Sequence, residues 1–394
     1  MLAFAVEIVT TALAFAGLVY YLLALWSARD FLAERSQRAS LFHPPVSILK
    51  PVKGLDPHMY ASFASHCRQD YFSEYEILFG VSSMEDPAVA AVRKLQAEFP
   101  QSDIHLILCP ETRGANGKVS NLSQILPYAR YDYLLINDSD IQVAPRYLSN
   151  IMAGFERAQK PGGRVGMVTA AYRGQASPTI GSRMEALGIS TDFIAGVLTA
   201  RKIEGGIHFG LGSTLAISRE ALDAIGGFLP LVDYLADDFE LGYRTAQAGY
   251  EVVLSAEVVD THLPAYTFPQ FLAHQLRWSR AIRDSRKQYF GLLFTFGLPL
   301  AIANVIASGM SLPSVALFSI LLAARVALAL TVGVLVLRDG QVLRDLWLLL
   351  PRDICALGIW AWSYAGHTIL WRGEQFSLNK GKLERVAISE SRVP

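Results

Sequence analysis

Cysteine is scarce in this sequence. The 394 residues include three cysteines, Cys67, Cys109 and Cys355, which lie far apart and form neither a CxxC pair nor part of a histidine cluster. Disulfide-stabilised domains and structural zinc sites both depend on closely spaced cysteines. The sequence therefore argues against a disulfide framework and a zinc site, and it predicts reduced thiols.

An excess of charge of one sign is also missing. Lys and Arg together number 35, and so do Asp and Glu, so the chain has no overall positive field that would attract a nucleic-acid backbone. We expect no nucleic-acid partner. Apolar residues are abundant, at 52% of the chain, and they concentrate in long runs near both ends.

The first apolar run covers residues 2–26, and Glu7 is its one charged residue. It exceeds the roughly 20 residues needed to cross the hydrocarbon core of a bilayer. A cleaved signal peptide is the other interpretation, but the run is too long and no basic residues precede it. We predict a retained transmembrane anchor at 1–28. The basic residues that follow favour a cytoplasmic position for the next region, and they are Arg29, Arg35 and Arg38.

Three further apolar runs occupy residues 291–308, 312–337 and 354–371 and predict C-terminal membrane segments over 291–372. The short Ser-Gly-Met link between the first two predicts a hairpin. If the third run also crosses the membrane, the basic tail at 373–394 lies outside, against the positive-inside tendency. We therefore expect one of the three runs to be interfacial or re-entrant and the tail to be cytoplasmic.

Alternating strand and helix patterns fill residues 45–265. Five short apolar runs have the composition of buried parallel strands, and they begin near residues 46, 75, 103, 131 and 164. Helical patterns separate the first four runs and follow the fourth, at 57–69, 86–98, about 119–129 and 145–157. This order predicts an α/β domain with a mostly parallel sheet. In such sheets ligands bind beyond the carboxyl ends of the strands, so the residues after each run are the candidate site residues.

Two of these strand ends can be interpreted in two ways. Asp86 follows the second run and precedes Pro87, a pair that either starts a helix or places a carboxylate in a binding site. Lys118 follows the third run in the segment "GANGKVSNL". The glycines there either form an ordinary turn or bring a lysine and free helix N–H groups to a phosphate.

The fourth run ends in "LLINDSDI", which carries Asp138 and Asp140. Two carboxylates at one strand end repel each other. A divalent cation, Mg²⁺ or Mn²⁺, removes that penalty and can bridge to a diphosphate. The alternative is that Asp138 caps a turn, but the position after a buried strand favours the metal site.

Asp237 and Asp238 in "ADDF" are the next candidates. Acids at this position either stabilise the N-terminus of a helix or include a general base that deprotonates a sugar acceptor.

Residues 266–290 predict an amphipathic interfacial helix. The spacing places His274, Arg277 and Trp278 on one face, and a basic band follows, made of Arg280, Arg283, Arg286 and Lys287. Such a helix can rest on anionic lipid. An Arg and a Trp facing a phosphate-rich cleft would also supply charge neutralisation and an apolar wall.

The motifs as a set resemble the membrane glycosyltransferases of family 2 and family 21 type. The resemblance is strongest to the ceramide glucosyltransferase family and its bacterial hopanoid-linked relatives, and it extends over nearly the whole chain. The motifs that carry it are "PVKGLDP", "EDPA", "GANGKVSNL", "NDSDI", "GGF", "ADDF" and "LRW".

The resemblance implies a GT-A-type nucleotide-diphospho-sugar transferase domain at 45–265 and a role for each matching residue. Lys53, Asp86, Lys118 and Asp138 would contact the nucleotide donor, and Asp138 and Asp140 would hold the metal. Asp238 would be the base, with Asp237 as the near alternative. Arg277 and Trp278 match the RW of a (Q/R)xxRW signature. His274 departs from that signature, which has Gln or Arg at its first position.

The implied reaction is transfer of a hexose, glucose or N-acetylglucosamine, from a UDP-sugar to a lipid hydroxyl with inversion. The lipid could be a ceramide, a diacylglycerol or a hopanoid polyol, and the enzyme would be held in a bacterial inner membrane with its catalytic domain in the cytoplasm. One alternative is a processive polysaccharide synthase, for which the apolar segments are few. The other is a non-catalytic membrane scaffold that binds nucleotide.

Overall fold

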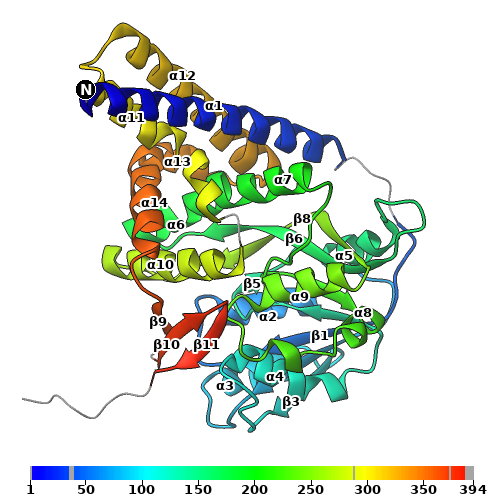
Figure 1. The fold of residues 1–394 in the computed structure, drawn as a ribbon. Coiled ribbons are helices and arrows are strands. Elements are labelled where there is room, and N and C mark those ends of the chain that lie inside the picture. The colour runs from blue at the N-terminus through cyan, green and yellow to red at the C-terminus, as the bar shows by residue number, and fades with distance from the viewer. Residues whose placement is uncertain (1, 35–39, 287–288, 372–373, 387–394) are drawn as a thin grey trace, which may run out of the picture.

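The structure is a computed structural model that describes residues 2–34, 40–286, 289–371 and 374–386. An α/β domain forms its lower two thirds, and a layer of long apolar helices lies above it (Figure 1).

An eight-stranded sheet forms the centre of the α/β domain, in the order β3-β2-β1-β4-β7-β6-β8-β5. The first four strands are parallel, and they are β1 Val46–Pro51, β2 Tyr75–Val81, β3 Asp103–Leu108 and β4 Tyr133–Ile136. β1, β2 and β4 are buried on both faces, as expected for strands that helices cover on each side, whereas β3 at the edge of the sheet is partly exposed.

The second half of the sheet is mixed, which corrects the expectation of a mostly parallel sheet. β7 runs antiparallel to both β4 and β6, and β5 runs antiparallel to β8, whereas β6 and β8 are parallel to each other. The bounds of these strands are β5 Ile141–Gln142, β6 Val165–Gln175, β7 Leu215–Ser218 and β8 Glu251–His262. An apolar run predicts burial but carries no information on strand direction, because both directions bury the same side chains.

The helices of the α/β domain follow the predicted pattern, with ends shifted by a few residues. The four that were expected are α2 Met59–Cys67, α3 Ala88–Glu98, α4 Gly117–Ile125 and α5 Tyr147–Met152. Short 3-10 turns, Leu126–Tyr128 and Ala153–Glu156, extend α4 and α5. The remaining helices before the apolar layer are α6 Ile180–Gly188, α7 Ile194–Ile203, α8 Arg219–Ala224, α9 Asp237–Gln247 and α10 Phe268–Ser285. A π-helical segment, Ile189–Phe193, joins α6 to α7.

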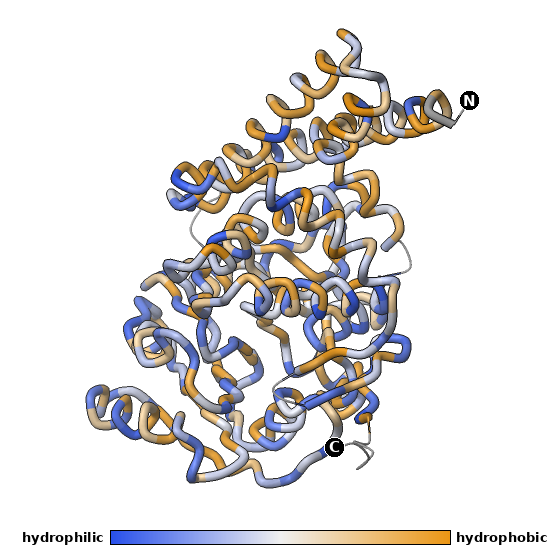
Figure 2. The backbone as a smooth tube through the Cα atoms, turned by 90° about the vertical axis from the view of Figure 1, so that its left-hand side faces the viewer, coloured by the Kyte–Doolittle hydropathy of each residue, from blue (hydrophilic) through white to orange (hydrophobic). Residues whose placement is uncertain are grey.

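Two helices in the described part of the chain are long and apolar enough to cross a membrane, Phe4–Glu34 within α1 (Leu2–Glu34) and Leu312–Val336, which begins with α12 (Leu312–Ala329). A bent pair, Tyr289–Thr295 and α11 (Gly297–Ala307), meets at 62° and has the shape of a broken span or a re-entrant loop. These helices are coloured mostly as hydrophobic at the top of Figure 2. The expected anchor and the 312–337 segment are therefore helices of spanning length.

Glycines let α1 and α11 approach closely. A Cβ atom on Gly17 would lie 2.2 Å from the Cα of Gly297, which is closer than two non-bonded carbon atoms can approach. Where the crossing helices carry no side chains, their backbones can pack directly, as small residues allow in membrane helix pairs. Asn304 of α11 strengthens this contact by donating to Glu7 O at 3.2 Å.

The third apolar run, 354–371, is not one helix. α14 (Leu349–Ser363) ends inside it, and the strand β9 (Thr368–Trp371) follows. β9 pairs with two more strands to form a three-stranded antiparallel sheet, and they are β10 Glu374–Asn379 and β11 Lys382–Arg385. The expected tail at 373–394 therefore contains folded structure up to Arg385, and residues 387–394 lie outside the described part.

The basic band on α10 points into the protein, which differs from the expected lipid-facing arrangement. Arg280 donates to Ala365 O at 2.8 Å, and Arg283 donates to Gly366 O at 3.0 Å. Arg286 lies over the ring of Phe209, 4.2 Å from its centroid. Arg280 and Arg283 thus fix the turn between α14 and β9, and Arg286 packs on Phe209. Lys287 lies outside the described residues.

Candidate active site

A cavity of about 900 Å³ opens at the carboxyl ends of β1 to β4. Its walls come from the loops after these strands, the first turn of α9, one face of α10 and the small C-terminal sheet. All ten residues singled out in the sequence line it, and they are Lys53, Asp86, Lys118, Asp138, Asp140, Asp237, Asp238, His274, Arg277 and Trp278. The size is typical of a site that encloses a nucleotide or a similar small molecule.

Asp86 starts a helix and also lines the cavity. Its Oδ1 accepts from Ala88 N at 2.9 Å, which caps the first turn of α3. The same carboxylate accepts from Gly54 N at 3.0 Å. This bond connects the loop after β1, which carries Lys53, to the loop after β2. It therefore restricts the conformation of both loops at the cavity wall.

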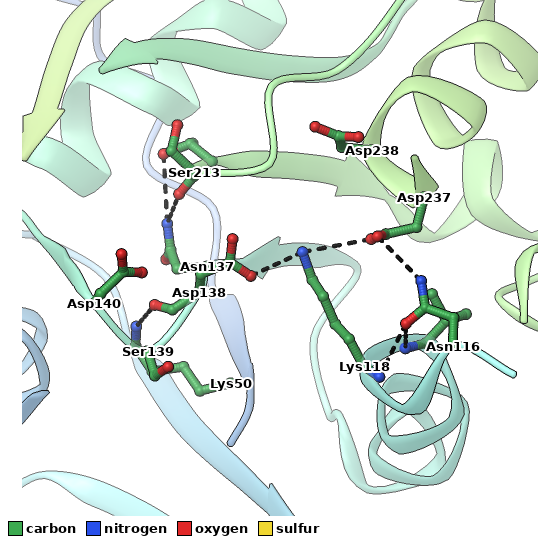
Figure 3. A network of polar contacts seen from close by, with 12 residues as sticks. Lys50, Asn116, Lys118, Asn137, Asp138, Ser139, Asp140, Ser213, Asp237 and Asp238 are labelled. Atoms are coloured by element: carbon green, nitrogen blue, oxygen red, sulfur yellow. Dashed lines mark hydrogen bonds and ion pairs between the residues drawn. The ribbon is translucent and has the colours of Figure 1, made fainter. Parts of the chain in front are cut away.

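Lys118 joins two acids from different elements (Figure 3). Its Nζ lies 2.8 Å from Asp138 Oδ1 and 3.4 Å from Asp237 Oδ2. Burial alone would lower the pKa of Lys118, but the charges of Asp138 and Asp237 outweigh burial and raise the pKa above its usual value. The lysine is therefore a cation held by carboxylates at the cavity wall. Asn116 positions it, since its side chain accepts from Lys118 N at 3.0 Å and caps α4.

The two acids of "NDSD" have different partners. Asp138 pairs with Lys118 and keeps 42% of its side chain exposed. Asp140 accepts from Thr261 Oγ1 of β8 at 2.5 Å and lies on the side of Asp138 away from Lys118 (Figure 3). Burial raises the pKa of the Asp140 carboxyl to about 6, and the negative charge of Asp138 adds to this rise.

Buried polar side chains hold the strand end that carries these acids. Asn137 donates to Ser213 O at 2.7 Å and to the Tyr147 hydroxyl at 2.8 Å. Lys50 of β1 donates to the backbone oxygen of Asp138 at 3.3 Å, and burial lowers its pKa to about 7. The position of Asp138 is thus determined by contacts to its backbone and to its neighbour, and its carboxylate remains available to a ligand.

The donor set at Asp138 and Asp140 fits Mg²⁺ or Mn²⁺ that is shared with a diphosphate. Among the described residues, three or more His, Cys, Asp or Glu ligand atoms gather within 4.8 Å of one another only at Glu76, Asp103 and His105, where Arg130 already pairs with both acids. The cavity therefore offers a cation few protein ligands. Magnesium sites that complete their coordination with substrate phosphates and water commonly have one or two carboxylates.

Asp237 and Asp238 are adjacent in sequence but differ in their surroundings. Asp237 is held by Lys118 and by Asn116 Nδ2 at 3.3 Å. Asp238 accepts from Phe239 N at 2.8 Å. Burial, followed by the charge of Asp237, raises the pKa of the Asp238 carboxyl to about 6.

Gly212 leaves space between the acids of the two motifs. A Cβ atom at this position would lie 3.1 Å from Asp238 Oδ2 and 3.8 Å from Asp138 Oδ2. A larger residue would project between the two carboxylates. The missing side chain keeps open the point at which a group bound near Asp138 could meet Asp238.

The α10 face forms the other wall of the cavity. His274 Nδ1 lies 3.0 Å from Glu185 Oε2 of α6. The imidazole stacks on the Tyr266 ring, with centroids 5.3 Å apart, and contacts the Trp278 ring at 5.1 Å. Aromatic side chains thus form much of this wall, and the pair of Glu185 and His274 lies among them.

Several cavity residues have no counterpart in the sequence-based predictions. Asp56 follows β1 and accepts from Ser139, and the strand-end rule could have identified it. Others come from segments without a motif, and they are Tyr172, Glu185, Tyr266, Trp371, Glu374, Phe376 and Arg385. The last four come from the C-terminal sheet, whose sequence was interpreted as the end of an apolar run, which includes Trp371, followed by a tail.

The C-terminal sheet reaches the cavity because its backbone is tied to the segment before α9. Leu383 N donates to Asp233 O at 2.7 Å, and Leu235 N donates to Gly381 O at 3.1 Å. These bonds hold β11 next to the segment that leads into Asp237. Such pairing between distant segments has no local sequence signature.

The chain is similar in sequence to known glycosyltransferases. A family model described as glycosyl transferase family 21 matches residues 9–384. Ceramide glucosyltransferase 3 of Caenorhabditis elegans is 26% identical over 289 residues, which are 68% of this chain and 59% of that protein. The ceramide glucosyltransferase of Komagataella phaffii is 30% identical over 158 residues, 37% of this chain and 31% of that protein. The matches thus span 59% or less of these curated relatives.

A solved structure shares the fold. The mannosyltransferase PcManGT from Pyrobaculum calidifontis, in complex with GDP-Man and Mn²⁺, superposes with a TM-score of 0.56 at 22% identity, covering 91% of this chain and 99% of that one. The α/β domain is therefore of the GT-A type, as the sequence predicts. Because the family model matches almost the entire chain, this protein belongs to glycosyl transferase family 21.

Proposed function

We propose that this protein transfers a hexose from a UDP-sugar to the hydroxyl of a membrane lipid, with inversion at the anomeric carbon. The observation that carries the proposal is the arrangement around Gly212. An exposed carboxylate suited to a metal-diphosphate, Asp138, lies across an open space from a buried carboxylate with a raised pKa, Asp238. The α/β domain that contains this cavity lies below two helices long enough to span a membrane.

Each side of the cavity has its own role in the proposed reaction. The loops that carry Lys53 and Asp86 bind the nucleotide. The hydrogen bond from Gly54 N to Asp86 fixes the two loops relative to each other at the cavity wall. Asp138 and Asp140 hold Mg²⁺ or Mn²⁺, which when bound neutralises charge on the diphosphate. Lys118 stabilises the departing UDP together with Arg277, which lines the opposite wall. Ceramide glucosyltransferases among the relatives support a lipid acceptor.

Asp238 is the general base. It takes the proton of the acceptor hydroxyl while the oxygen attacks the anomeric carbon and the bond to the diphosphate breaks, so one displacement inverts the configuration. Asp237 is less suited to this role because it is already paired with Lys118 and Asn116. A carboxylate with a raised pKa is both a better proton acceptor and ionised at neutral pH.

The membrane helices hold the site at the lipid surface. We assign residues 1–28 and the segments within 291–372 to the bilayer, α10 within 266–290 to the interface, and the α/β domain to the cytoplasm. Arg29, the described member of the basic cluster that follows the first span, supports this orientation.

The test is a product screen with the full chain in membranes. Radiolabelled UDP-glucose, UDP-N-acetylglucosamine and GDP-mannose are each incubated with a ceramide, a diacylglycerol and a hopanoid polyol, and lipid products are identified by mass spectrometry. We expect one UDP-sugar to give a lipid that carries a single sugar. A polymeric product would favour the processive synthase, and no product with any pair would contradict the proposal. Membranes with Asp238→Asn serve as the matched control.

A further inference from the structure

Glu185 is a buried acid that the proposed chemistry does not use. It lies on α6, its side chain is 1% exposed, and it lines the cavity. Its Oε2 pairs with His274 Nδ1 at 3.0 Å. Its Oε1 has no hydrogen-bond partner among the residues that the structure describes.

An unpartnered carboxylate oxygen in such a place is costly. Burying a polar group without a hydrogen bond destabilises a protein, and a charged group does so more strongly. An apolar side chain at this position would not carry the cost of an unpartnered oxygen. The acid therefore points to a ligand that supplies a hydrogen-bond donor.

The position of Glu185 favours the acceptor over the nucleotide. In Figure 1, α6 and α10 lie near the lower end of α14, whereas α3 and α4, which flank the nucleotide loops, lie at the far end of the domain. The π-helical segment that follows α6 packs against α12, one of the candidate spans. A group that reaches Glu185 thus comes from the side on which a lipid would enter.

The surroundings of Glu185 match the junction between a lipid head group and its apolar body. A chain of rings extends along this wall, with centroids 5.6 Å apart between Tyr172 and Phe193 and 6.3 Å apart between Phe193 and Trp278. Ile189 and Ile282 add aliphatic surface to the cavity. Apolar walls with one or two placed polar groups are the usual form of a small-molecule site.

We propose that Glu185, oriented by His274, binds a second hydrogen-bond donor of the lipid acceptor, a hydroxyl or an amide N–H beside the hydroxyl that receives the sugar. The inference rests on the proposed function and names a feature of its substrate class. A lipid with two neighbouring donors, such as a ceramide, satisfies both Glu185 and Asp238. A diacylglycerol, with one free hydroxyl, leaves Glu185 unpartnered.

The test measures lipid binding separately from turnover. Fluorescent short-chain ceramide and fluorescent diacylglycerol are titrated against the full chain in detergent with UDP present. Wild type should prefer the ceramide. Glu185→Met removes the acceptor oxygens at similar volume, so ceramide affinity should fall about 10- to 100-fold, as for lost hydrogen bonds to a charged group. Glu185→Gln, which keeps one acceptor oxygen, should fall in between.

Stability separates binding from a structural role. Glu185→Met removes one partner of the contact with His274, so it should unfold at a lower temperature than wild type, and its ceramide affinity is measured at a temperature at which it remains folded. Glu76→Gln is the control, since Glu76 is equally buried but fully partnered by Ser47 and Arg130. It should unfold at a lower temperature and leave ceramide affinity unchanged.

Four outcomes would overturn the inference. They are equal binding of both lipids by wild type, no binding of either lipid, unchanged ceramide affinity in Glu185→Met, and a loss of UDP-sugar affinity relative to UDP in that variant. The last would assign Glu185 to the donor sugar. If wild type binds ceramide through Glu185 but transfers no sugar, the role of Glu185 in lipid binding stands and the proposed sugar transfer fails.

Discussion

Lys118 Nζ lies 2.8 Å from Asp138 Oδ1, so the carboxylate most suited to a metal-diphosphate already carries an ion pair. The same ammonium group lies 3.4 Å from Asp237 Oδ2. One lysine thus links the strand-end motif to the motif at the start of α9. In the proposed reaction, the diphosphate of the donor would contact this lysine together with a metal, and the consequences can be measured.

Removing the carboxylate of Asp138 should weaken donor binding. In Asp138→Asn the charge that attracts a cation is lost, and Lys118 retains Asp237 as its partner. We expect UDP-sugar affinity in the presence of Mn²⁺ to fall about 10- to 100-fold, the usual effect of disturbing a metal site. Calorimetry with and without EDTA measures it. EDTA should weaken donor binding to wild type, and equal affinity of wild type in EDTA and Mn²⁺ would rule out the metal site.

Asp238 and Asp237 should differ in their effect on turnover. Asp238→Asn removes the proposed base, so kcat should fall about 10²- to 10⁴-fold with little change in KM for the donor. Asp237→Asn keeps the base and loses one partner of Lys118, so its loss should be smaller. Steady-state rates of the two variants, with circular dichroism as a folding control, test the assignment. A larger loss in Asp237→Asn would transfer the role of base to Asp237.

Activity should fall in mildly acidic solution. Burial raises the pKa of the Asp238 carboxyl to about 6. Below this pH the carboxylate becomes protonated, so the proposed base is lost. The rate should therefore fall as the pH drops below about 6, by up to about 10-fold per pH unit. A pH-rate profile that stays flat down to pH 4.5 would contradict this.

The glycine crossing of α1 and α11 should be intolerant of a methyl group. In Gly17→Ala the new Cβ would lie 2.2 Å from Gly297 Cα, so the helices must separate. We expect a destabilisation of about 1–3 kcal/mol, as for overpacked cores. Gly358→Ala in α14 is the matched control, because a Cβ there meets no atom within 4 Å and alanine favours the helix. Thermal unfolding in detergent should be lower for the first variant and unchanged or higher for the second.

Much of the site follows from local rules that apply to the sequence. Strand-end residues of a parallel sheet meet at one edge, which is why Asp86, Lys118, Asp138 and Asp140 were identified without coordinates. Helical spacing placed His274, Arg277 and Trp278 on one face, and all three line the cavity. These residues line one cavity because the position of each depends on a short stretch of chain whose geometry is nearly invariant.

Other features depend on contacts between distant segments. Local sequence suggested a phosphate role for Lys118, but its two carboxylate partners come from β4 and α9. Glu185 lies within a mostly buried helix, and a role for it is indicated only by its contact with His274, 89 residues away. The strands β9 to β11 form part of the cavity wall although their sequence was interpreted as the end of a span and a tail.

The sequence by itself determined the class of this protein: an α/β transferase domain of family 21 between apolar helices, with its acids at the strand ends. Composition, periodicity and motif order carry that information, because secondary structure and burial depend mainly on neighbouring residues. Only the tertiary structure decided which acid is paired, which has a raised pKa and which lacks a partner. Those properties depend on the charges and the burial that distant segments impose on a side chain, and no local pattern encodes them.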